Sequence, residues 1–199
     1  MPYPVLVTIE GQVERRDRLT AAFRPILAIP HAILVGPIYW FYHAGAVGLL
    51  GAAVYFLAIV SWFTLLTTGE HMPGIRDLSL YYLRWRTRAV AYMALFVDKY
   101  PPFGDGAYPA SIEVTEPGLP RDRATIAVRL LLAIPHLLLL FFLLIGWLVT
   151  SVIAWFAILF TGSYPPSLYP FGVGVMRWML RVEAYLLLLV DEYPPFALE

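Results

Sequence analysis

Two long stretches without a charged side chain dominate the pattern of hydrophobic and polar positions. Residues 25–69 and 130–176 contain no Asp, Glu, Lys or Arg, over 45 and 47 positions respectively. A helix needs about 20 apolar residues to cross a bilayer, so each stretch is long enough for a helical hairpin. A hairpin also satisfies the backbone hydrogen bonds within its own helices. We therefore expect four transmembrane helices, near residues 24–43, 47–68, 124–145 and 147–161.

The two expected hairpins differ in length. We place the turn of the first at His43-Ala44-Gly45 and the turn of the second near Gly146. The first hairpin is 12 residues longer, and the extra residues surround the aromatic cluster 39–43. Aromatic rings favour the interface between membrane and water, so this end is expected to reach further out of the bilayer. The shorter second hairpin could instead be shallow or tilted.

The chain contains the same pattern twice. Residues 3–31 match residues 108–136 with 13 identities in 29, and both blocks end in Leu-Ala-Ile-Pro-His. A second block, residues 62–103, matches residues 155–196 with 18 identities in 42. We therefore divide the chain into a first unit, 1–104, and a second unit, 105–199. Each unit crosses the membrane an even number of times, so the two should be parallel copies.

Each unit is expected to add a strand and a third helix to its hairpin. The runs 5–9 and 111–115 are rich in Val, Ile and Thr, which predicts two short cytoplasmic strands that could pair. The helices expected near 76–98 and 168–191 carry Arg and Trp on one side and apolar residues on the other, which suits the membrane interface. A third full span per unit is the alternative. The predicted fold is thus an all-α integral membrane protein with four spans, two interfacial helices and two short strands.

Charge and composition support a membrane location. The chain is 60% hydrophobic and 14% charged, has no cysteine, and has a net charge of zero. Zero net charge gives no field that would attract nucleic acid. All 14 Lys and Arg residues lie outside the hairpin tips. By the positive-inside rule, we expect a multi-pass protein of the bacterial cytoplasmic (inner) membrane with both termini in the cytoplasm.

These motifs resemble a bacterial integral-membrane family known only as a domain of unknown function (DUF4389-like), present in two tandem copies. The shared pattern is Leu-Ala-Ile-Pro-His, Trp-Phe-x-x-Leu-x-Thr-Gly, Arg-Trp-x-x-Arg-Val-x-Ala-Tyr and Asp-x-Tyr-Pro-Pro-Phe. The second unit fits it nearly throughout, whereas residues 67–71 and 87–91 of the first unit depart from it. The resemblance implies an integral membrane fold and transfers no activity, cofactor or catalytic residue.

His31 and His136 are the candidate cofactor ligands. Each follows a proline inside an expected span, and two such histidines could ligate haem or a metal between the units. The alternative is a histidine that bonds to a backbone carbonyl freed by the proline. No acidic residue nearby in sequence would orient either ring, so we predict no cofactor and keep haem as an alternative.

Arginine and tryptophan side chains are expected to form a belt at the cytoplasmic interface. Such a belt could hold anionic lipid headgroups or a partner, or simply anchor the helices at a fixed depth. Its predicted members are Arg24, Arg84, Arg88, Arg129, Arg177, Arg181, Trp85 and Trp178.

Asp98 and Asp191 are expected to act as structural latches. Each falls near the end of a predicted helix, where the helix dipole disfavours a negative charge. An arginine partner would compensate for this, and the Arg-Asp-Arg triplets at 16–18 and 121–123 are the candidates.

The sequence contains no arrangement typical of a catalytic site, a phosphate-binding loop or a metal centre. We therefore expect a non-enzymatic scaffold or accessory subunit of a larger membrane complex, in contact with lipids and with other membrane-protein subunits or a second copy, and not with nucleic acid. The alternative is a small transporter or lipid-handling protein with a site between the two units. A haem-binding redox module that uses His31 and His136 is the third hypothesis.

Overall fold

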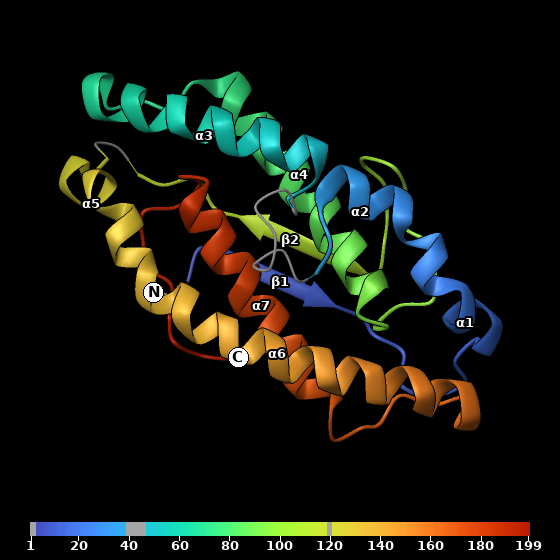
Figure 1. Ribbon diagram of the computed structural model, residues 1–199. Coiled ribbons are helices and arrows are strands. Elements are labelled where there is room, and N and C mark those ends of the chain that lie inside the picture. Colours follow the sequence, from blue (N-terminus) through green and yellow to red (C-terminus); the bar gives the residue numbers. More distant parts are fainter. Residues whose placement is uncertain (1–2, 39–46, 119–120) are drawn as a thin grey trace.

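The computed structural model describes residues 3–38, 47–118 and 121–199, and it consists mainly of helices (Figure 1). The first unit contains β1 (Val5–Ile9), α1 (Arg18–Leu27), α2 (Ile29–Val35), α3 (Gly48–Thr68) and α4 (Pro73–Met93). The second unit contains β2 (Ala110–Val114), α5 (Arg123–Ala127), α6 (Arg129–Thr161) and α7 (Tyr169–Leu186).

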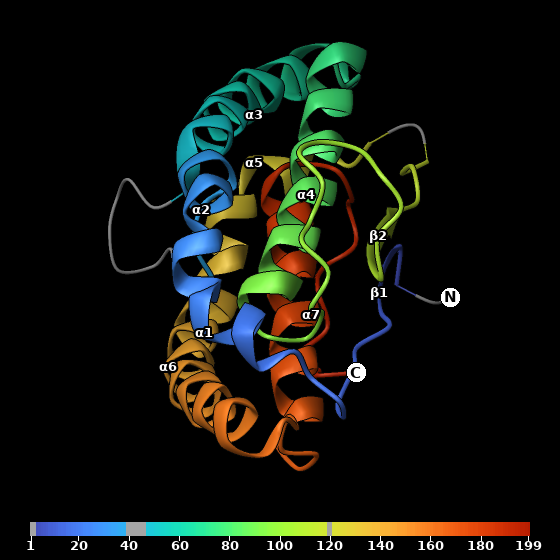
Figure 2. The ribbon, with the colours of Figure 1, turned by 90° about the vertical axis from the view of Figure 1, so that its right-hand side faces the viewer.

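These elements form three layers (Figure 2). Helices α1, α2, α3 and α6 make an outer arc, which we call the apolar layer. Helices α4 and α7 lie in the middle, and the two strands cover their other side. The strands pair antiparallel, with Val5 opposite Val114 and Ile9 opposite Ala110. Every second residue of each strand faces α4 and α7, because side chains alternate along a strand.

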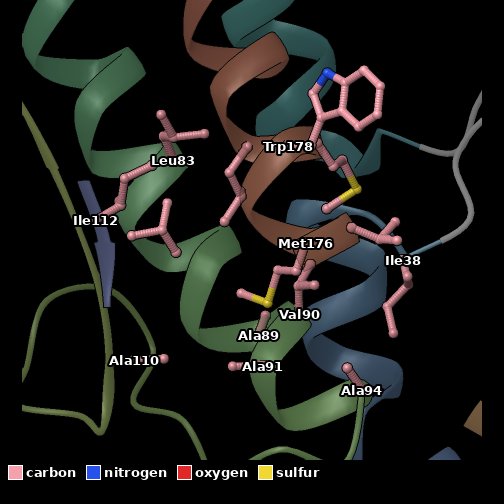
Figure 3. Packing of buried hydrophobic residues seen from close by; sticks show 14 of the residues in the cluster. Ile38, Leu83, Ala89, Val90, Ala91, Ala94, Ala110, Ile112, Met176 and Trp178 are labelled. Atoms are coloured by element: carbon pink, nitrogen blue, oxygen red, sulfur yellow. The ribbon is translucent and has the colours of Figure 1, made fainter. Parts of the chain in front are cut away.

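The core lies between the layers. Leu83 and Val90 of α4, Met176 of α7 and Ile112 of β2 are all buried there (Figure 3). Burying a side chain of this size contributes about 1.5–3 kcal/mol. From Ser79 onward, α4 is buried on nearly every side, because the apolar layer covers one face and the strands cover the other.

The two units exchange contacts at both ends of the apolar layer. Trp62 of α3 donates to the carbonyl oxygen of Ile126 in the second unit at 2.8 Å. Its counterpart Trp155 of α6 donates to the carbonyl oxygen of Ala21 in the first unit at 2.9 Å. Each unit therefore donates a tryptophan hydrogen bond to the other, and the two units form one folded body rather than two independent hairpins.

The predicted second hairpin is wrong. Its apolar stretch forms one continuous helix, α6, which passes through Gly146 without a turn. A single glycine costs a helix only about 1 kcal/mol, which the packing of α6 on α7 outweighs. The second unit also lacks the 12 residues that separate α2 from α3 in the first unit.

The first apolar stretch agrees more closely with the sequence pattern. Helix α3 begins one residue after the predicted start at position 47 and ends at the predicted residue, Thr68. The segment before it is two short helices, α1 and α2, with a bend of 44° between them. Pro30 lies in the first turn of α2, just after the bend, and a proline cannot donate the hydrogen bond that a continuous helix requires. The predicted turn His43-Ala44-Gly45 and the aromatic cluster lie outside the described residues.

The third helix of each unit was expected at the membrane interface, and the structure corrects this prediction. Helices α4 and α7 form the middle layer and are mostly buried by their own chain. Their arginine and tryptophan side chains fitted an interfacial helix equally well, because sequence alone does not show that the strands cover them. Within the described residues, two helices are long and apolar enough to span a membrane, or three if the bent pair α1–α2 counts as one.

Candidate functional site

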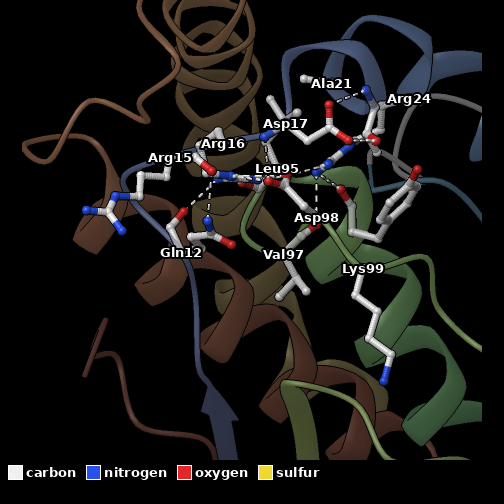
Figure 4. A network of polar contacts seen from close by, with 12 residues as sticks. Gln12, Arg15, Arg16, Asp17, Ala21, Arg24, Leu95, Val97, Asp98 and Lys99 are labelled. Atoms are coloured by element: carbon white, nitrogen blue, oxygen red, sulfur yellow. Dashed lines mark hydrogen bonds and ion pairs between the residues drawn. The ribbon is translucent and has the colours of Figure 1, made fainter.

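Each unit contains a latch in which two arginines hold one aspartate. In the first latch, the Arg16 Nε donates to Asp98 Oδ2 at 3.0 Å and the Arg24 Nη2 donates to Asp98 Oδ1 at 2.8 Å (Figure 4). The second latch joins Arg121 and Arg129 to Asp191 in the same way. Arg16 and Arg121 open the two Arg-Asp-Arg triplets, so the triplets do supply the partners of these aspartates.

The latches tie the start of the apolar layer to the end of the middle layer. Arg24 also donates to the carbonyl oxygens of Tyr92 and Val97, and its guanidinium lies 4.4 Å from the centre of the Tyr92 ring. Burial alone would raise the pKa of Asp98, but hydrogen bonds from Arg16 and Arg24 outweigh it and lower the pKa below the usual value of 3.8. Asp98 therefore remains ionised at neutral pH.

His31 and His136 each lie in an aromatic cage formed by their own unit. The Trp85 Nε1 donates to His31 Nδ1 at 3.0 Å, and the Phe103 ring stacks on the imidazole at 4.5 Å between ring centres. His136 has the same relation to Trp178 and Phe196. Because Nδ1 accepts a hydrogen bond, the neutral imidazole carries its proton on Nε2. Within the described residues, no group of three or more His, Asp or Glu side chains could hold a metal ion.

An ion pair that the sequence analysis did not identify lies between the two middle helices. The Arg86 Nε of α4 donates to both carboxylate oxygens of Glu183 in α7, at 2.7 and 2.8 Å. The two side chains are 1% and 2% exposed. Arg86 also donates to the carbonyl oxygen of Val35 at 2.8 Å and so connects the middle layer to the end of α2.

The repeat itself contained a signal for this pair. Aligned by their offset of 93 residues, Arg86 corresponds to Met179 and Val90 corresponds to Glu183. Position 86 of the first unit and position 183 of the second thus carry opposite charges where the other unit has an apolar residue, and these two repeat positions are four residues apart. In two helices related by a pseudo-twofold axis, such positions lie opposite each other.

The structure places much of the predicted arginine and tryptophan belt inside the molecule. Arg24, Arg129, Trp85 and Trp178 are buried and bonded to their own chain, so they do not face lipid headgroups here. Arg88 is also buried, and it donates to the carbonyl oxygen of Gly106 at 2.9 Å. The remaining members differ: Arg84 is exposed, whereas Arg177 and Arg181 are half-buried.

The apolar layer exposes large hydrophobic side chains along its whole length. Leu49 of α3 is 69% exposed, and Leu130 and Phe160 near the two ends of α6 are 71% and 76% exposed. Helix α6 buries only one stripe of residues and exposes the rest. Soluble proteins rarely expose a continuous apolar surface of this extent, so it indicates a membrane or a large interface.

A cavity of about 610 Å³ opens where the two units meet in the apolar layer, and we call it the seam pocket. One wall comes from α1 and α2, the opposite wall comes from the second half of α6, and the end of α4 contributes Met93. The lining is apolar or aromatic except for the charged side chain of Arg24 and the hydroxyl group of Ser151.

The layered fold, the internal repeat and the apolar layer define a helical protein of two fused units with membrane-type helices. The chain belongs to the family described as domain of unknown function (DUF4389), which matches it twice, at residues 30–104 and 123–197. The expected family and its two tandem copies are thereby confirmed. Neither the curated proteins nor the solved structures contain a match to this chain.

Proposed function

We propose that this protein is a non-enzymatic scaffold or accessory subunit of a bacterial membrane complex, embedded through its apolar layer. The observation that carries the proposal is the separation of the two faces. Most of the large exposed apolar side chains lie on α1, α2, α3 and α6, whereas the strands on the opposite face expose Thr8, Ser111 and Glu113 beside a single large apolar side chain, Leu6. One face suits lipid and the other suits water or a hydrophilic partner.

The position of the strands supports helices that lie in the plane of one leaflet rather than helices that span. Along the direction of α6, the strands lie level with the middle of the molecule (Figure 1), in the layer on the other side of α4 and α7 (Figure 2). If α6 crossed the bilayer, the exposed Glu113 would sit at the level of the hydrocarbon core, where a charged side chain costs several kcal/mol. Helix α6 is also about 50 Å long, whereas the hydrocarbon core is about 30 Å thick.

In the proposed orientation, the apolar layer lies in the cytoplasmic leaflet of the inner membrane, and both termini and the strands face the cytoplasm. Amphipathic helices that lie in a membrane bury their apolar face about 5–10 Å deep, which the single layer of helices matches. This arrangement replaces the four expected spans and keeps the cytoplasmic location of the termini that the positive-inside rule predicts.

Single-cysteine variants test the orientation directly, because the chain contains no cysteine. Ala124→Cys and Thr161→Cys place an exposed thiol near each end of α6. A membrane-impermeant maleimide should label both from the cytoplasmic side of inverted vesicles, as it should label the strand control Ser111→Cys. Ala53→Cys, on the lipid-facing side of α3, should be protected. Labelling of positions 124 and 161 from opposite sides of the membrane would disprove the in-plane orientation.

Co-purification tests the scaffold role. Gentle detergent extraction followed by mass spectrometry should recover stoichiometric membrane-protein partners. Thr8→Arg on the strand face should reduce their recovery, while Ser167→Arg, at an exposed position in the turn between α6 and α7, serves as the control. A protein that purifies alone, or equal recovery with both variants, would count against a partner on the strand face.

The seam pocket favours lipid handling as the second candidate function, because its site lies between the two units. Vesicles containing the protein should then accelerate lipid exchange between leaflets or between vesicles, and an unchanged rate would reject this candidate. The haem hypothesis remains a prediction that the absorbance spectrum tests: purified protein without a Soret band would reject it.

A further inference from the structure

The seam pocket has the size and the lining of a site for an elongated apolar ligand. Its volume of about 610 Å³ falls within the range of about 300–1,000 Å³ typical of small-molecule sites. Pro25, Ala28 and Ala32 form one wall, and Val152 and Phe156 form part of the other. Few polar groups are available to bind a sugar, a nucleotide or an ion, so the lining selects for hydrocarbon.

The residues of the first wall differ from their counterparts in the repeat. In the second unit, Leu130 and Leu137 occupy the positions equivalent to Pro25 and Ala32. The wall that α1 and α2 contribute to the seam pocket therefore carries smaller side chains than the equivalent positions of α6.

One buried polar group lines this apolar space. Arg24 is 2% exposed, and its Nε–H has no hydrogen-bond partner among the described residues. Its Nη atoms are occupied by Asp98 and by the carbonyl oxygens of Tyr92 and Val97. A buried donor without a partner is unfavourable, so a ligand that brings an acceptor oxygen gains from bonding to this N–H group.

The pocket also opens on the surface that the proposed function places in the membrane. Pro25, Ile29 and Phe156 are exposed on the apolar layer while they line the pocket. A lipid chain in the same leaflet could therefore enter from the side without passing through water. This step rests on the proposed membrane embedding.

We propose that the seam pocket binds one acyl chain of a membrane phospholipid, with an ester carbonyl oxygen that accepts the Arg24 Nε–H. The chain fills the apolar space between the two units, and the carbonyl supplies the acceptor that Arg24 lacks. A bound lipid of this kind would join α1 and α2 of the first unit to α6 of the second.

Native mass spectrometry of the full chain tests the assignment. Wild-type protein extracted in mild detergent should retain one phospholipid per chain. The double variant Ala32→Leu/Ser151→Leu fills the pocket from both walls and should lower the retained fraction at least fivefold. Ala53→Leu, which makes the same Ala-to-Leu change at an exposed position on α3, is the control and should retain lipid as the wild type does. Equal retention by the pocket variant and the control would overturn the assignment.

Two further arms keep the result interpretable. If the double variant does not fold, Ser151→Leu alone adds volume from one wall and should still lower retention, whereas unchanged retention would overturn the proposal.

Delipidated wild-type protein is also offered phosphatidylglycerol vesicles or palmitate. Phospholipid adducts support the assignment, and adducts with palmitate alone would overturn the choice of a membrane lipid. Flotation with the same vesicles separates the two proposals: protein that floats but retains no lipid refutes only the pocket assignment, and protein that does not float refutes the membrane role.

Discussion

Removing the carboxylate of Glu183 should strongly destabilise the protein. The Glu183→Val substitution leaves the guanidinium of Arg86 buried without its counter-ion, and arginine cannot give up its proton. Breaking a buried ion pair by removing one partner costs about 3–5 kcal/mol. For a chain of this size, that loss corresponds to a fall in Tm of about 6–20 °C.

The double variant Arg86→Met/Glu183→Val should recover much of this loss. It reproduces the apolar residues that the repeat already holds at the equivalent positions, Met179 and Val90, both of which are buried. Replacing a buried ion pair with apolar residues is often neutral or stabilising. The carbonyl oxygen of Val35 loses its donor, however, which costs about 1–3 kcal/mol. We therefore expect the double variant to be less stable than wild type but more stable than Glu183→Val alone.

The remaining single variant gives a pH signature. In Arg86→Met, Glu183 stays buried without a partner, and burial, which already raises its pKa in the wild type, acts unopposed. Because its pKa is higher in the folded state than in the unfolded state, its contribution to stability is present at low pH and is lost as the pH rises through the folded-state pKa. The loss of stability that Arg86→Met causes relative to wild type should therefore be smaller at pH 5 than at pH 8.

The assay compares wild type, the two single variants and the double variant in one mild detergent. Circular dichroism monitors their thermal unfolding at a series of pH values. The coupling energy is the difference between the effect of the double variant and the sum of the two single effects. Additive effects, with Glu183→Val no worse than other core substitutions, would show that the Arg86–Glu183 pair is not held as a buried ion pair. A stability difference for Arg86→Met that does not change with pH would refute the explanation based on protonation of Glu183.

Three further predictions concern the latches and the ends of the apolar layer. Asp98→Asn removes the charge that Arg16 holds and should lower the free energy of unfolding by about 1.5–3 kcal/mol. Since folding lowers the pKa of Asp98, the gap between wild type and variant should narrow progressively as the pH falls below about 4, and a gap that stays constant as the acid titration proceeds would contradict the prediction. Trp155→Phe removes the hydrogen bond to the carbonyl oxygen of Ala21 and should cost about 0.5–1.5 kcal/mol in thermal unfolding, whereas an unchanged Tm would mean that this contact between the units is not stabilising. Gly69→Ala places a side chain at a φ of 81° at the end of α3 and should cost about 1–2 kcal/mol, which a denaturant titration measures and a neutral result would exclude.

Local chemistry allowed several elements to be predicted from the sequence. The run of Val, Ile and Thr at 5–9 becomes β1, and the uncharged stretch that ends at Gly69 becomes α3, whose last residue precedes a glycine in the left-handed conformation. Each of these features depends on residues close together in the chain.

Features that depend on distant residues were missed or misplaced. Gly146 could have ended a helix, but α7 packs against α6 and keeps it continuous. Arg24 and Trp85 could have faced lipid, but the end of α4 and His31 supply partners inside the molecule. Arg86 and Glu183 lie 97 positions apart, so no local pattern identifies them as partners.

By itself, the sequence determined the duplication, the family, the apolar character of α3 and α6, and the arginine–aspartate chemistry of the latches. Composition and repeated motifs carry this information, and neither requires knowledge of neighbours in space. Only the tertiary structure decided that α4 and α7 lie inside, that α6 is one helix, and that the units meet at a buried ion pair and an apolar pocket. These outcomes follow from which surfaces cover one another, and an amphipathic helix looks the same in sequence whether lipid or its own chain covers it.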